Sequence, residues 1–97
     1  MTTKGGEFLN YSTLLKNSIY KERLTLGEIE EKLKNFGQKT NKAYISKLQN
    51  GKLPPAGDRL NEALAIVLNI DPIDLKAAAY REKIPAEVLE RINSNNF

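Results

Sequence analysis

The 97-residue chain contains no cysteine, no histidine and no tryptophan. Without thiols and imidazoles it has no disulfide bond, no Cys or His nucleophile, no His general base and no Cys/His zinc site. Its carboxylates do not occur in a motif with a general base, a metal-ligand spacing or a glycine-rich phosphate loop. The sequence therefore argues against an enzyme and predicts neither a cofactor nor a bound metal.

Long apolar segments are also absent. The longest run, Ala63 to Leu68, has six residues, whereas a helix that spans a bilayer needs about 20. The residues from Met1 to Lys4 lack the apolar stretch of a secretory signal. A hydrophobic fraction of 40% and a charged fraction of 28% are typical of an ordinary globular domain. We therefore predict one globular domain that resides in the cytoplasm and has no membrane partner.

Positive charge is concentrated in one part of the chain. Residues 1–57 hold ten Lys and Arg against five Glu, a balance of +5, and residues 58–97 hold five against seven acidic residues, a balance of −2. The window from Lys32 to Lys52 has six lysines and no acidic residue. Such a block favours a polyanionic partner. The alternative interpretation is a lysine face that serves only solubility.

The periodicity along the chain is helical throughout. One helix is predicted from about Glu7 to Lys21, and a second from the capping-box pair Thr25 and Glu28 to about Lys34. A third short helix follows the N-cap Asn41 and stops at Asn50-Gly51. The prolines of residues 52–57 interrupt the pattern before a fourth helix. These signals predict an all-α fold.

The second half of the chain continues this pattern. Asp58 is the predicted N-cap of a fourth helix that ends around Asn69. Asp71-Pro72 opens a fifth helix that runs to about Tyr80. Ile84-Pro85 ends it, and residues 86–92 are predicted to form a short tail helix. The predicted organisation is thus a domain at residues 7–80 followed by a tail at residues 81–97.

The third helix and its surroundings carry a family resemblance. The run from Asn41 to Lys52 (NKAYISKLQNGK) and the later run from Leu60 to Ala65 (LNEALA) resemble the Cro/CI-type helix-turn-helix family of XRE-like, lambda-repressor-like domains. The resemblance covers about residues 8–76. It implies a compact five-helix domain whose third helix enters the DNA major groove.

The resemblance also implies a set of DNA-binding residues. It places Lys42, Ala43, Tyr44 and Lys47 toward the major groove, where lysine donates to guanine and alanine contacts a thymine methyl group. It places Asn41, Ser46, Asn50 and Lys52 near the phosphates. Two alternatives stay open: Asn41 is a helix cap with or without DNA, and Tyr44 could simply cover the core.

The sequence departs from the family in the turn before the third helix. The stretch from Lys34 to Thr40 makes this turn about five residues longer than the usual one. The second helix begins with Leu26 where the family often has a glutamine that contacts phosphate. Our hypothesis is that Lys39, in the long turn, replaces this missing contact.

These features predict a sequence-specific double-stranded DNA-binding regulator, such as a small bacterial or phage repressor of the XRE type. A homodimer is expected, because two half-sites one helical turn apart raise affinity and specificity. The candidate dimerisation residues are the apolar ones of the tail: Ile84, Val88, Leu89 and Ile92. The alternative is a protein-interaction module, such as an antitoxin or antirepressor adaptor, with a possible regulatory protein partner for the acidic C-terminal part.

Overall fold

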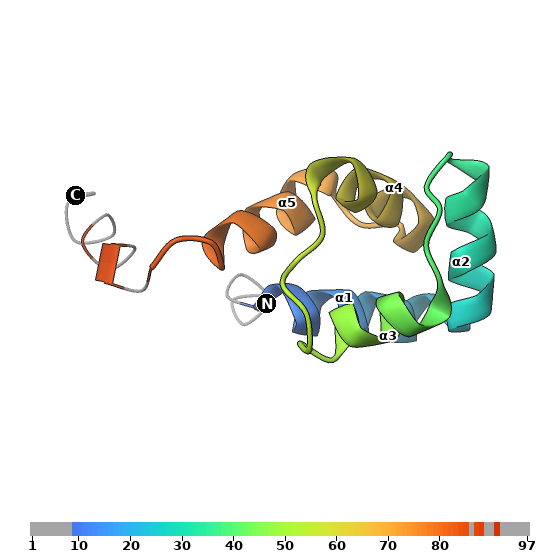
Figure 1. Cartoon of the computed structure of the whole chain (residues 1–97), viewed down its shortest axis with the longest axis horizontal. Helices are drawn as coiled ribbons and strands as arrows, with labels where there is room; N and C mark the ends of the chain where they lie inside the picture. Colours follow the sequence, from blue (N-terminus) through green and yellow to red (C-terminus); the bar gives the residue numbers. More distant parts are fainter. Residues whose placement is uncertain (1–8, 86, 89–90, 92–97) are drawn as a thin grey trace.

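The computed structural model describes residues 9–85, 87–88 and 91 (Figure 1). Within these residues the chain forms five α-helices and no β-strand, which confirms the all-α prediction. The helices are α1 (Tyr11–Glu22), α2 (Leu26–Asn35), α3 (Lys42–Gln49), α4 (Asp58–Leu68) and α5 (Pro72–Arg81). In this part of the chain, no helix has the length and apolar character needed to cross a membrane.

Side-chain caps define most helix starts. In α2 the Thr25 hydroxyl accepts the Glu28 N–H at 3.1 Å, and the Glu28 carboxylate accepts the Thr25 N–H at 2.8 Å. This reciprocal pair is the predicted capping box. Asp71, which precedes Pro72, likewise accepts the Ile73 N–H, as predicted for the start of α5. Local sequence therefore determines where these two helices begin.

Two predicted helix starts were wrong. The first helix begins at Tyr11 rather than Glu7, because Asn10 is its N-cap and accepts the Thr13 N–H at 2.9 Å. The N-cap of α4 is Gly57, and no side chain caps it. Asp58 is instead the first helical residue, and its carboxylate accepts the Tyr80 hydroxyl from α5.

The core is built from one face of every helix. Every helix packs against at least two others; α2, for example, contacts α3 and α4. The large apolar side chains that are essentially inaccessible to solvent are Tyr11, Leu15, Ile29, Leu33, Ile45, Leu48, Leu64, Leu68 and Leu75. They come from all five helices.

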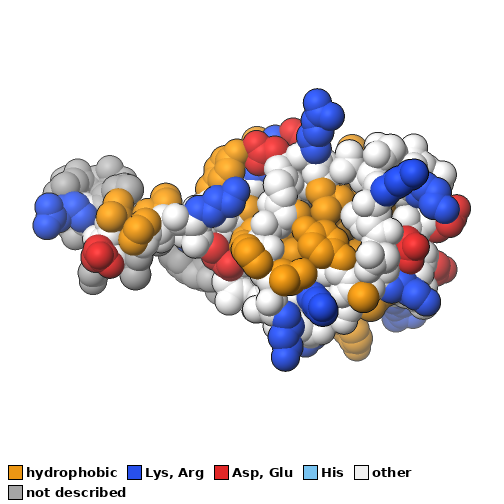
Figure 2. All heavy atoms as spheres, in the orientation of Figure 1, with side chains coloured by type: hydrophobic (Ala, Val, Ile, Leu, Met, Phe, Trp, Pro, Cys, Tyr) orange, Lys and Arg blue, Asp and Glu red, His pale blue; other side chains and the backbone are white. Residues whose placement is uncertain are grey.

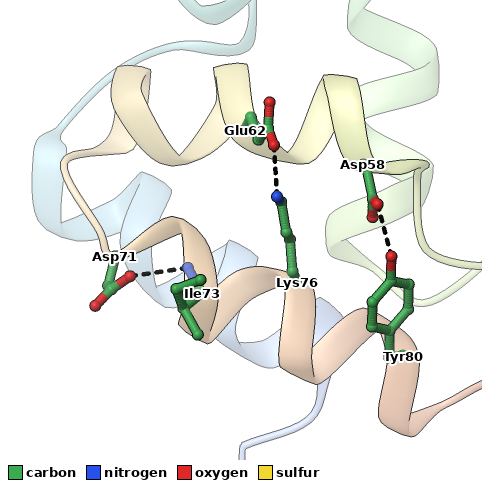
Figure 3. A network of polar contacts seen from close by, with 6 residues as sticks. All are labelled: Asp58, Glu62, Asp71, Ile73, Lys76 and Tyr80. Atoms are coloured by element: carbon green, nitrogen blue, oxygen red, sulfur yellow. Dashed lines mark hydrogen bonds and ion pairs between the residues drawn. The ribbon is translucent and has the colours of Figure 1, made fainter.

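Polar contacts join α4 and α5 on their outer side (Figure 3). The Lys76 ammonium pairs with the Glu62 carboxylate, and the Tyr80 hydroxyl donates to Asp58 at 2.6 Å. These hydrogen bonds to carboxylates raise the pKa of Lys76 and the pKa of Tyr80. The pairs fix how the two antiparallel helices align.

The chain beyond α5 extends away from the helical body, at the end of the molecule opposite α2 (Figure 1). Glu87, Val88 and Arg91 have helical backbone, as predicted for a tail helix. The rest of that predicted helix and the predicted domain start at residue 7 lie outside the described residues.

Candidate nucleic-acid interface

Helix α3 is held in the body by its apolar side. Ile45 and Leu48 are fully buried, and the helix packs against both α1 and α2. Because these two residues are three apart, they share one face and fix the rotation of the helix. The side of α3 opposite these two residues therefore faces away from the core.

The predicted base-contacting residues lie on that outward side. Lys42, Ala43 and Lys47 are all exposed, at positions i, i+1 and i+5 of the helix. Ala43 and Lys47 are four residues apart and share one face, and Lys42 lies about 100° around the helix from Ala43. In the space-filling view, Lys and Arg side chains project from the edge of the molecule along which α3 runs (Figure 2). The structure thus brings together a narrow helix and a basic face, the form that a major groove admits.

Tyr44 lies at the border between core and surface. It is half-buried and packs against the core cluster, so covering the core is one of its roles. Because Tyr44 is only half-buried, the rest of its side chain stays accessible beside the exposed residues of α3. Among the predicted base-contacting residues it is the one that the core restrains most.

The polar residues predicted near phosphates also stabilise the helix ends. Asn41 accepts the Tyr44 N–H at 2.8 Å, which satisfies one orphan amide of the first turn. At the other end, Asn50 Nδ2 donates to the Ser46 carbonyl at 2.9 Å. Asn41 and Asn50 are therefore caps in the free protein, while Ser46 is half-buried and Lys52 is exposed.

A Schellman motif ends α3. Gly51 has a φ of 70°, its N–H donates to the Leu48 carbonyl, and the Lys52 N–H donates to the Lys47 carbonyl. This left-handed position favours glycine, since a Cβ atom would be strained there. The motif turns the chain sharply and leaves Lys52 beside the end of the basic helix.

The long turn between α2 and α3 comprises residues 36–41. Gly37, with a φ of 77°, ends α2 in a second Schellman motif, in which the Gln38 N–H donates to the Leu33 carbonyl. Lys39 follows and is exposed, as the phosphate-contact hypothesis requires. On α2, Lys34 lies 3.8 Å from Glu31, so this lysine of the basic block is partly neutralised.

One neighbour of the basic face was missed by the sequence analysis. A Cβ atom on Gly27, at the start of α2, would lie 3.6 Å from Lys42 Cδ. The aliphatic stem of Lys42 therefore passes over the first turn of α2. Nothing in the local sequence indicates this approach, because it depends on how α2 and α3 pack.

The structure bears less on the other predicted site, in the tail. Ile84 is half-buried and Val88 is 45% exposed. Leu89 and Ile92 lie outside the described residues. The dimerisation role of these four residues stays a prediction.

The described residues contain no cluster of three or more acidic, His or Cys side chains placed to hold a metal ion. No protein-family model, no curated protein and no solved structure matches this chain.

Proposed function

We propose that this chain is a sequence-specific double-stranded DNA-binding regulator that inserts α3 into the major groove. The observation that carries the proposal is the outward face of α3, where Lys42, Ala43 and Lys47 are exposed on a helix anchored by Ile45 and Leu48. The resemblance of residues 41–52 to Cro/CI-type helix-turn-helix domains supports the same role.

The positive charge of α3 and of the turn before it favours DNA over an uncharged partner. No acidic residue occurs between Lys32 and Lys52, so α3 and the turn before it present an uninterrupted positive segment of chain. Lysines of this kind displace the counterions condensed on DNA and provide affinity that does not depend on sequence. Specificity then depends on the few side chains that reach the base edges.

A selection from a random duplex library tests the proposal. The selected duplex and a scrambled duplex are titrated with the full chain at two salt concentrations. We expect the selected duplex to bind at least about 10³-fold more tightly. Equal, steeply salt-dependent binding to both would contradict the proposal and favour the protein-interaction module.

Replacing Lys47 with glutamine is expected to weaken binding to the selected duplex about 10- to 100-fold. The loss should depend on the base that Lys47 contacts, because a lysine–guanine contact discriminates by roughly 1–3 kcal/mol. The measurement is the affinity for the selected duplex and for its single-base variants, at fixed salt.

Lys39→Ala is the matched comparison, since it removes the same charge from the turn rather than from α3. If Lys39 contacts only phosphate, this variant weakens binding to all duplexes alike and lowers the slope of log affinity against log salt by about 1. Lys83→Ala, beyond α5, should leave both quantities unchanged. A uniform loss for Lys47→Gln would contradict its role in base recognition.

A further inference from the structure

A groove opens on the surface between the α2–α3 turn and α4. It has a volume of about 290 Å³ and is lined by Phe36, Gln38, Arg59, Glu62, Ala63 and Ile66. Two of its apolar side chains are unusually accessible, since Phe36 is 49% exposed and Ile66 is 58% exposed. Large apolar side chains that line a common hollow are typical of an interaction site.

The groove also contains a cation without a counter-charge. Within the described residues, Arg59 has no ion-pair partner, whereas Glu62 pairs with Lys76. A segment that fits this groove therefore needs two side chains that are close in sequence. One is an apolar side chain that packs against Phe36 and Ile66, and the other is a carboxylate that pairs with Arg59. An arginine and a carboxylate form the strongest of the common side-chain pairs.

The chain itself contains such a segment. After α5, Val88 is 45% exposed and Glu87, immediately before it, is also exposed. Both residues have helical backbone and lie where the chain has left the helical body. Glu87 and Val88 thus present a carboxylate beside an uncovered apolar side chain.

We infer that the groove between the α2–α3 turn and α4 binds the Glu87-Val88 segment of a second copy of this chain. Val88 packs between Phe36 and Ile66, and the Glu87 carboxylate pairs with Arg59. The contact involves no DNA, so the inference goes beyond the proposed function and does not depend on it.

The proposed contact joins two different surfaces of the molecule, the tail and the groove. The tail leaves the body at one end, and α2, whose C-terminal turn forms one wall of the groove, lies at the other end (Figure 1). A copy that offers its tail at one end therefore keeps its own groove open at the other. Such a contact is head-to-tail and, when it does not close into a ring, it extends into short chains of molecules. On DNA, head-to-tail copies favour direct repeats rather than a palindrome.

The association is expected to be weak. A short segment in a groove buries much less area than a stable dimer interface, so the dissociation constant should be about 0.1 mM. Sedimentation velocity of the full chain without DNA should show a mean mass that rises with concentration. Val88→Asp and Ile66→Asp should each weaken the association more than about tenfold, because both place a charge in the apolar contact.

Mixing these two variants distinguishes the proposed contact from other interfaces. The Val88→Asp chain keeps an intact groove, and the Ile66→Asp chain keeps an intact tail. Together they restore one contact and should form a one-to-one pair that does not grow further. Circular dichroism checks that both variants are folded, which is expected because both side chains are exposed.

Charge reversal tests the ion pair. Arg59→Glu and Glu87→Arg should each weaken association about threefold to fivefold, and the double variant should regain most of the loss. A wild-type chain that stays monomeric to about 1 mM, tenfold above the expected constant, would overturn the inference. Self-association that persists in both aspartate variants, or a mixture that forms no pair, would overturn it as well, since either result points to another occupant or face.

Discussion

Replacing Asn61 with alanine is expected to lower the free energy of unfolding by about 3 kcal/mol. Asn61 is fully buried in α4 and serves two partners: it accepts the Tyr11 hydroxyl at 2.6 Å, and its Nδ2 donates to the Ala56 carbonyl at 2.8 Å. Alanine leaves both partners without their hydrogen bond. A buried polar group that loses its partner costs roughly 1–3 kcal/mol, and here there are two.

Urea unfolding followed by circular dichroism measures this change. Asn17→Ala is the matched control, because Asn17 is exposed on α1 and its replacement should alter stability by no more than about 0.5 kcal/mol. Tyr11→Phe should lie between the two, since it leaves only Asn61 Oδ1 without its donor. A loss below about 1 kcal/mol for Asn61→Ala would mean that water or a shift of the chain replaces both hydrogen bonds.

This buried network shows why some of the fold was predictable and some was not. The starts of α2, α3 and α5 depend on a side chain within three residues of the amide that it caps, so the sequence alone predicted them. The burial of Asn61 depends on Tyr11, which is 50 residues away. From sequence alone, an asparagine is predicted to be exposed, because a buried polar side chain needs a hydrogen-bond partner. That partner is known only from the packed structure.

The two candidate binding surfaces, the outward face of α3 and the groove beside α4, also differ in how far the sequence predicts them. The outward face of α3 was predictable, because Ile45 and Leu48 had only to be recognised as core for Lys42 and Lys47 to be exposed. The groove was not predictable. Its walls come from the α2–α3 turn and from α4, which are separated in the chain by α3 and the segment after it, so they meet only in the packed structure.

Raising the pH above 10 is expected to destabilise the fold through Tyr11. Burial is the main reason that the pKa of this phenol is raised well above its usual value of 10.0, and nearby Tyr44 and Glu82 act in the same direction. The Ala56 backbone, which acts in the opposite direction, does not offset them. The folded chain then keeps a proton that the unfolded chain releases.

The sign of the pH dependence follows from this difference in bound protons. A raised pKa in the folded state contributes its full stability below pH 10 and loses it as the pH rises toward the folded-state value. One such group makes the free energy of unfolding fall by up to about 1.4 kcal/mol per pH unit. Urea unfolding at a series of pH values between about 9 and 11.5 measures this slope across the usual titration range of a phenol.

The Tyr11→Phe variant separates this phenol from the other groups that titrate in the same range. Tyr80 and Lys76, whose pKa values are raised by Asp58 and Glu62, also favour the protonated folded chain, so they add a slope of the same sign. Because Tyr80 is exposed and Lys76 is only half-buried, solvent screens their share. Tyr11→Phe should therefore be less stable than the wild type at neutral pH yet lose stability less steeply above pH 10, whereas Tyr80→Phe should keep most of the slope. Equal slopes for the wild type and Tyr11→Phe would show that the buried phenol does not control the alkaline transition.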